Sequence, residues 1–415
     1  MSGGALSGLL VADFSRVLAG PYATMLLADL GAEVVKVERP GTGDDTRAWG
    51  PPYAPGGQAT YFLGVNRNKR SIALDLGDEA DLEVARALAT RADVLVENFR
   101  PGTMDRLGLG YDALRALNPG LVYCSITGFG SGAGAGLPGY DLIVQAVGGL
   151  MSVTGEPDGP GTKAGVALVD VITGLHAALG VLAALRHRDR TGEGGHLTGT
   201  GRPGAGGTHP EGPTSKPDIR EPGGGERGPG AGQRVEVSLL SSLLSALTNH
   251  SSAYAAAGVV PKAMGNRHPS IVPYEVFHAA DRPLVIAAGN DRQFQALCAV
   301  LDRPDLATDP RYATNAGRVA ARDGLVAALD DALRERPADE WFGRLTAAGV
   351  PCGPINDLAA AFALAEELGL EPSVRLDGVG QVTAPVRLSA TPPSYRRPPP
   401  ELGQDDAWVR EILGP

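Results

Sequence analysis

Short apolar runs alternate with amphipathic stretches along the first third of the chain. The run at 9–14 is followed by Gly20-Pro21 and an apolar stretch through Leu30, with Gly31 just beyond it. Proline near the first helical position and glycine past the last one are the usual ends of a helix. Further runs typical of strands lie at 33–38, 71–76, 93–98 and 121–127, and a helix is expected over 105–117. Strands that alternate with helices predict an α/β fold with a parallel sheet.

The pattern changes after Asp170. An alanine-rich apolar stretch at 171–186 predicts a buried helix that begins directly after this residue. The segment 194–232 is dominated by Gly, Pro, Thr and charged residues. It cannot bury enough apolar surface to offset its ordering entropy, so it is predicted to be a disordered loop. Beyond it, strands are expected at 284–290 and 381–388, and helices at 292–301, 318–334 and 406–413. These elements predict a smaller α+β domain and a C-terminal segment.

Composition narrows the class of protein. Apolar residues make up 43% and charged residues 20% of the 415 residues, as in an ordinary enzyme of two domains. The net charge of -10 argues against a nucleic-acid-binding protein. No window of about 18 uninterrupted apolar residues exists, so no membrane association is expected. The three cysteines are far apart and predict neither disulfide bonds nor a metal site. The N-terminus lacks the pattern of a signal peptide, and a cytoplasmic protein is expected.

The first strand, turn, helix and second strand have the order of a dinucleotide-binding unit that ends at Glu38. The turn reads SRVLAGP over 15–21, however, and lacks the glycines that bring a backbone close to a pyrophosphate. A nicotinamide cofactor is therefore not expected, and an α/β unit without any nucleotide stays an open alternative. Arg39 follows the second strand, where a guanidinium suits the additional ribose phosphate that coenzyme A (CoA) carries.

Long blocks of the sequence resemble the class III CoA-transferase family, the CaiB/BaiF type that includes formyl-CoA transferases. The blocks are DFSRVLAGPYATMLLADLGAEVVKVERPG (13–41), NRNKRSIALDL (66–76), DVLVENFRPGTMDRLGLGY (93–111), GYDLIVQAVGGLMSVTG (139–155), DVITGLHAALGVLAAL (170–185) and GVPCGPIND (349–357). They follow the family's order along nearly the whole chain, and only the segment 194–232 has no counterpart. That segment is expected to be a surface insertion or an artefact of gene annotation.

The resemblance implies a large Rossmann-like CoA-binding domain and a smaller α+β domain, in an interlocked homodimer. The implied division assigns 1–193 to the first part of the large domain and 194–232 to the insertion. It assigns 233–262 to a returning strand and a linker helix, 263–348 to the small domain, and 349–415 to a segment that returns to the large domain.

Asp170 is the candidate nucleophile. Taken alone, an aspartate directly before a helix is most simply an N-cap. The resemblance instead aligns the segment VDVITGL with the family's nucleophilic aspartate, and the two roles are compatible. The positive end of the helix is expected to keep this carboxylate ionised, and its free amides to receive negative charge during the reaction. The implied chemistry is the exchange of CoA between acids through an aspartyl-CoA thioester.

The same alignment implies the other site residues. Tyr140 is expected beside the nucleophile, where it helps to position the carboxylates. The residues expected to contact CoA are Val17, Leu18, Ala19, Arg39, Leu74, Asn98, Phe99 and Arg106, although Leu74 and Phe99 also suit a core and Arg106 a solvated helix. Acyl-CoA and a carboxylic acid are the expected substrates, with no metal and no permanently bound cofactor.

Two other functions stay open. The family includes 2-methylacyl-CoA racemases, in which a histidine precedes the motif's aspartate as a base. Here Gly139-Tyr140-Asp141 places a tyrosine there, and a phenol is a poor base at neutral pH. A non-catalytic acyl-CoA-binding protein is the third possibility. The stretches 43–52, 265–277 and 287–294 look closest to succinyl-CoA:glutarate (hydroxymethylglutarate) CoA-transferases, which favours succinyl-CoA and a dicarboxylate such as glutarate. Arg47, Arg267 and His268 are candidates to hold the distal carboxylate.

Overall fold

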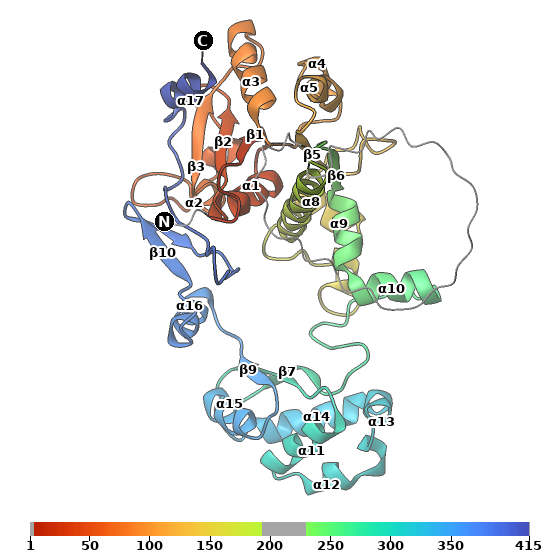
Figure 1. Ribbon diagram of the computed structural model, residues 1–415. Helices are drawn as coiled ribbons and strands as arrows, with labels where there is room; N and C mark the ends of the chain where they lie inside the picture. Colours follow the sequence, from red (N-terminus) through yellow and green to blue (C-terminus); the bar gives the residue numbers. More distant parts are fainter. Residues whose placement is uncertain (1–3, 193–229, 415) are drawn as a thin grey trace, which may run out of the picture. The chain divides into compact units, whose positions relative to one another are not determined.

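The computed structural model describes residues 4–192 and 230–414 (Figure 1). Nearly all of the predicted disordered loop at 194–232 therefore lies outside the described residues. The chain divides into two compact units, and each is described by itself. The first comprises Met1–Val144, Ala167–Ala246 and Val374–Pro415, and the second Gln145–Val166 and Leu247–Ser373. The expected division put the small domain at 263–348, so the second unit is longer and includes an earlier segment.

A six-stranded parallel sheet forms the centre of the first unit (Figure 1). Its strands are β1 (Leu10–Asp13), β2 (Glu33–Glu38), β3 (Lys69–Ala73), β4 (Val94–Glu97), β5 (Val122–Thr127) and β6 (Arg234–Ser238). The spatial order is β3-β2-β1-β4-β5-β6. The order reverses between β1 and β4, and open α/β sheets of this kind bind ligands at the carboxyl ends of the strands at such a point.

Helices cover both faces of this sheet. The helices α3 (Glu79–Arg91) and α17 (Asp406–Leu413) bury Leu88 and Leu413 in one core with Val35 and Ile72 of the sheet. Across the sheet, α1 (Ala19–Asp29) packs along α8 (Leu168–Gly192), which also contacts β5 and β6. The remaining elements of this unit are η1 (Asp45–Ala48), α2 (Thr60–Leu63), α4 (Thr103–Arg106), α5 (Tyr111–Leu117), α6 (Asp141–Val147, whose end lies in the second unit), α9 (Leu239–Ala246) and β11 (Val379–Val382).

Helix α8 is the long, strongly apolar helix of the first unit. Its residues Leu168–Thr191 are long and apolar enough to cross a membrane by composition alone. Core helices share this composition, and α8 packs against α1, α9 and two strands of the sheet.

The second unit is built on a three-stranded antiparallel sheet of β7 (Tyr274–His278), β8 (Pro283–Ala287) and β9 (Cys352–Pro354). Its core contains Phe277, Ile286, Phe294, Leu329 and Trp341. The helices and the remaining strand are α7 (Leu150–Val153), α10 (Thr248–Ala257), α11 (Asp291–Val300), α12 (Pro304–Thr308), η2 (Pro310–Tyr312), α13 (Asn315–Ala320), α14 (Arg322–Leu333), α15 (Ala338–Ala347), α16 (Leu358–Glu367) and β10 (Ser373–Leu376, shared with the first unit). The predicted mixed α/β fold with a parallel sheet is confirmed.

Four predicted elements need correction. The helix expected over 105–117 is interrupted at Gly108, which adopts a left-handed conformation, and forms α4 and α5 instead. The helix expected over 318–334 is broken at Ala321 into α13 and α14. The strand expected at 381–388 overlaps β11 only at Gln381 and Val382, and the Ala384 N–H beyond it donates to the Tyr395 hydroxyl group. The helix after Asp170 begins earlier, at Leu168, so Asp170 lies within its first turn.

Candidate active site

The turn between β1 and α1 lies where the strand order of the parallel sheet reverses. Asn98, which follows β4, holds this turn from one side. Its Oδ1 accepts a hydrogen bond from the Arg16 N–H at 2.8 Å, and its Nδ2 donates to the Arg16 carbonyl at 2.7 Å. Val17 comes next and adopts a φ of 70°, a left-handed conformation that is strained for a β-branched residue. The turn therefore needs support from its neighbours.

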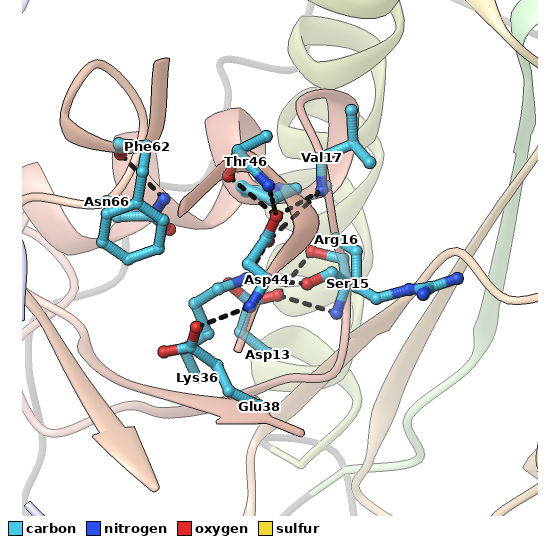
Figure 2. A network of polar contacts seen from close by, with 12 residues as sticks. Asp13, Ser15, Arg16, Val17, Lys36, Glu38, Asp44, Thr46, Phe62 and Asn66 are labelled. Carbon is cyan, nitrogen blue, oxygen red and sulfur yellow. Dashed lines mark hydrogen bonds and ion pairs between the residues drawn. The ribbon is translucent and has the colours of Figure 1, made fainter. Parts of the chain in front are cut away.

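That support comes from a buried network of charges beneath the turn (Figure 2). The Val17 N–H points to both carboxylate oxygens of Asp44 at 3.3 Å. Lys36 forms an ion pair with Asp44 at 2.8 Å and donates to the Ser15 carbonyl at 2.8 Å. Burial raises the pKa of Asp44, but the Lys36 ammonium and bonds from Lys36 and Thr46 outweigh it and lower the pKa to about 2. Lys36 thus contacts the turn directly and also through Asp44.

Asp13, at the end of β1, anchors the other side of the network. Its carboxylate accepts hydrogen bonds from Ser15 and Thr24 and pairs with Lys69 at 3.0 Å. All four side chains are buried. Burial lowers the pKa of Lys69 to about 8 in spite of the attraction of Asp13. These contacts fix α1 to β1 and β3.

Asp170 is positioned by a second turn, which precedes α6. The Oδ1 atom of Asp141 accepts from the backbone N–H groups of Val169 at 2.8 Å and of Asp170 at 3.1 Å, and so caps the first turn of α8. A Cβ atom on Gly139 would lie 2.4 Å from the Cα atom of Gly128. Only glycine permits this approach, which ties the Asp141 turn to the end of β5.

The environment of Asp170 opposes its ionisation. The side chain is half-buried. Burial first, and then the neighbouring Asp141 carboxylate, raise the pKa of Asp170 to about 7. The expectation that the helix end keeps this carboxylate ionised is therefore corrected: two first-turn amides are already bonded to Asp141, and a like charge stands beside it. A carboxyl group that titrates near neutral pH in a cavity is typical of a functional site.

Two cavities adjoin the turn between β1 and α1. The first, of about 410 Å³, contains Asp170. Six of the predicted site residues line it with Asp170: Val17, Leu18, Ala19, Asn98, Phe99 and Tyr140. The second, of about 530 Å³, is lined by Arg39, Leu74 and Phe99. Arg106 is exposed and lines neither cavity. Its side chain donates a hydrogen bond to the hydroxyl group of Thr103, a residue that lines the second cavity.

The candidates for the distal carboxylate have other partners. Arg47 donates two hydrogen bonds to the Glu38 carboxylate, both at 2.7 Å, and its guanidinium lies 3.7 Å from the ring centre of Phe62. Arg267 belongs to the second unit, where it pairs with Glu275 and Asp323. His268 belongs to that unit as well, and its backbone N–H donates to Tyr274.

The sequence reading missed Arg16, Lys36, Asp44 and Asp141. Arg16 lines both cavities, and Asp141 follows Tyr140 directly. The position of Asp141 one residue past a predicted site residue was a usable signal. No sequence signal indicated the pairing of Lys36 with Asp44, because Lys36 lies in a strand and Asp44 in the loop after it, and no local pattern relates the two residues. Within residues 4–192 and 230–414, no group of three His, Cys, Asp or Glu side chains is arranged to hold a metal ion.

A doubly wound parallel sheet with a carboxyl group in a cavity at its switch point is typical of α/β enzymes. The model of CoA-transferase family III matches residues 6–200 and 225–406, and the chain belongs to this family. It is 41% identical to the acetyl-CoA:oxalate CoA-transferase of Acetobacter aceti over 98% of this chain and 95% of that one. It is 40% identical to the succinyl-CoA:glutarate CoA-transferase of Mus musculus, over 98% and 86%.

Among solved structures, a CAIB/BAIF family protein from Brucella suis superimposes with a TM-score of 0.82 at 38% identity, with full coverage of both chains. The predicted family and the assignment as an enzyme, a CoA-transferase, are confirmed.

Proposed function

We propose that this CoA-transferase moves CoA from succinyl-CoA to a dicarboxylic acid such as glutarate, through a thioester on Asp170. The observation that carries the proposal is the position of the Asp170 carboxyl group. It lines a cavity together with the turn Val17–Ala19, next to a second cavity lined by Arg39 and Leu74. Glutarate appears in the name of the mouse relative, and oxalate in that of the bacterial one.

The proposed exchange has four steps. The ionised Asp170 carboxylate attacks the thioester carbonyl of the donor, which gives an acyl-aspartyl anhydride and CoA thiolate. The thiolate attacks the aspartyl carbonyl, releases the donor acid and forms the aspartyl-CoA thioester. The acceptor carboxylate attacks that thioester, which gives a second anhydride and the thiolate. The thiolate then attacks the acyl carbonyl of the acceptor and regenerates Asp170.

The described residues support these steps in two ways. A pKa near 7 leaves Asp170 about half ionised at neutral pH, so the nucleophile is available. The N-terminus of α1 has no side-chain cap, and Ala19 in its first turn lines the same cavity. The positive end of this helix therefore lies where the oxyanions and the thiolate develop.

A homodimer is part of the proposal. The α8 side chains of Leu175 and Leu179 are 46% and 65% exposed, and Leu244 on α9 is 48% exposed. Apolar side chains on a core helix are expected to be covered, and a second copy of the chain would cover them.

The test incubates the protein with succinyl-CoA and a panel of carboxylic acids and identifies new acyl-CoA products by mass spectrometry. Hydroxylamine should modify Asp170 only in the presence of acyl-CoA. A variant with Asp170→Ala that still transfers CoA would refute the mechanism. The racemase alternative predicts exchange of the substrate's α-proton in deuterated water without transfer of CoA.

A further inference from the structure

The backbone of Arg16 is held by hydrogen bonds on both sides, although its side chain is partly exposed. Asn98 fixes both the N–H and the carbonyl of its backbone, at 2.8 and 2.7 Å. The next residue, Val17, has a strained conformation, and its N–H points to the Asp44 carboxylate. Lys36 donates a hydrogen bond to the carbonyl of the preceding Ser15 (Figure 2). Because the backbone of this turn is fixed, the Cα–Cβ bond of Arg16 has a defined direction.

The guanidinium group of Arg16 has unused hydrogen-bonding capacity. It lies 5.3 Å from the ring centre of Phe99. Among the described residues its guanidinium group pairs with the Asp45 carboxylate, at 3.4 Å, and the two side chains are 38% and 44% exposed. Such a pair is weak in solvent. The Nε atom is buried and has no hydrogen-bond partner among residues 4–192 and 230–414, although buried polar atoms in proteins are nearly always paired.

The location of this group suits a substrate. Arg16 and Phe99 line both the cavity of Asp170 and the neighbouring cavity of Arg39. Arg39 and Arg100 each line one of the two cavities, and Arg47 is bound to Glu38. A planar guanidinium binds carboxylate or phosphate oxygens through two parallel hydrogen bonds. Asp45 contacts the Nη1 atom of Arg16, so the guanidinium group keeps further donors for such a ligand.

We infer that Arg16 binds an oxyanion of the substrates, and that it determines specificity at the border of the two cavities. The inference rests on the proposed function. The oxyanion is either the far carboxylate of the exchanging dicarboxylic acid or a phosphate of CoA. Both have the same chemistry, and the substrates used in the experiment distinguish them.

The experiment compares Arg16→Gln with wild type in steady-state kinetics. Loss of hydrogen bonds to a charged group should raise the affected KM roughly ten- to hundredfold. If the oxyanion is the carboxylate, KM rises for glutarate and much less for butyrate, which lacks the second carboxylate. If it is a phosphate, KM rises for succinyl-CoA but is unchanged for succinyl-pantetheine, which lacks the phosphates. Equal KM values for all four substrates in both proteins would overturn the inference.

Two variants exclude indirect effects. Asp45→Asn removes the competing carboxylate and should change the affected KM in the opposite direction, whereas Arg16→Lys should recover only part of the loss because it keeps the charge without the fork. Arg115→Gln, a surface change on α5, should alter none of the constants. Thermal melting should show that Arg16→Gln folds normally.

A binding measurement separates this inference from the proposed function. Calorimetry of glutarate and of CoA with Asp170→Asn enzyme requires no turnover. The two proteins compared are Asp170→Asn and Arg16→Gln/Asp170→Asn. Even if wild type fails to transfer CoA, weaker binding of either ligand to the double variant supports the inference. Equal binding of both ligands to the two proteins rejects it.

Discussion

The buried ion pair of Lys36 and Asp44 provides the sharpest test of how the active-site turn is built. Both side chains are fully inaccessible to solvent, and their charged atoms are 2.8 Å apart. Replacement of Lys36 by methionine keeps the volume of the side chain but leaves the Asp44 carboxylate buried without its cation. Removal of one partner of such a pair typically costs about 3–5 kcal/mol.

The pKa of Asp44 gives an independent value. Its fall from 3.8 to about 2 corresponds to about 2 kcal/mol in favour of the ionised form in the folded protein. Because this pKa is lowered on folding, the stability that it supplies is present above pH 4 and is lost as the pH falls toward 2. Without Lys36, only the hydrogen bonds from Thr46 and Val17 oppose burial, the largest influence on this pKa, and we expect the pKa of Asp44 to rise above the unfolded value. The carboxylate of the variant then destabilises the fold more as the pH rises.

The assay is urea denaturation of wild type, Lys36→Met and Lys36→Met/Asp44→Asn at pH 8 and at pH 5. The single variant should lose about 3–5 kcal/mol at pH 8 and less at pH 5. The double variant should recover part of the loss, because no charge is left buried. A single-variant loss that is equal at both pH values, together with no recovery in the double variant, would refute this account of the pair.

Three further predictions concern the site and its assembly. The value of kcat/KM should rise with pH around a midpoint near 7 as Asp170 ionises. Asp141→Asn should lower that midpoint, because it removes the like charge beside Asp170. A midpoint that does not move would contradict the electrostatic cause. Gly139→Ala should reduce kcat/KM at least tenfold, roughly 1.4 kcal/mol, because its Cβ atom would collide with the backbone of Gly128, directly after β5. Gly132→Ala, which has open space around it and lines neither cavity, should be silent. Light scattering should give twice the chain mass for wild type, and Leu179→Glu should yield monomer; an unchanged dimer would place the interface elsewhere.

Local patterns predicted much of the first unit. The bounds of β2 agree with the expected 33–38, and α17 begins and ends where its amphipathic pattern does. These elements have strong local signals, because a continuous apolar run or a regular polar face depends only on residues that are close together in the sequence. The missed boundaries lie where the signal is weak, as at Gly108 and Ala321, since one residue is enough to interrupt a short helix.

The residues of the candidate site were proposed from the resemblance, whereas their electrostatics depend on contacts that the sequence does not give. The resemblance supplied Asp170 and Tyr140, and six predicted residues line the cavity of Asp170. The sequence reading assigned an ionised Asp170, because it placed the residue at an uncapped helix end. The structure reverses this with Asp141, 29 residues earlier, whose carboxylate takes the amides and adds a like charge.

The sequence by itself thus determined the order of strands and helices, the parallel sheet and the family. Only the tertiary structure decided which charges are buried together. Lys36 and Asp44 are ordinary charged residues in the sequence, yet they form a pair inaccessible to solvent that supports a strained turn at Val17. The physical reason is range: hydrophobic periodicity acts between neighbours along the chain, whereas burial and Coulomb energy depend on distances that exist only after folding.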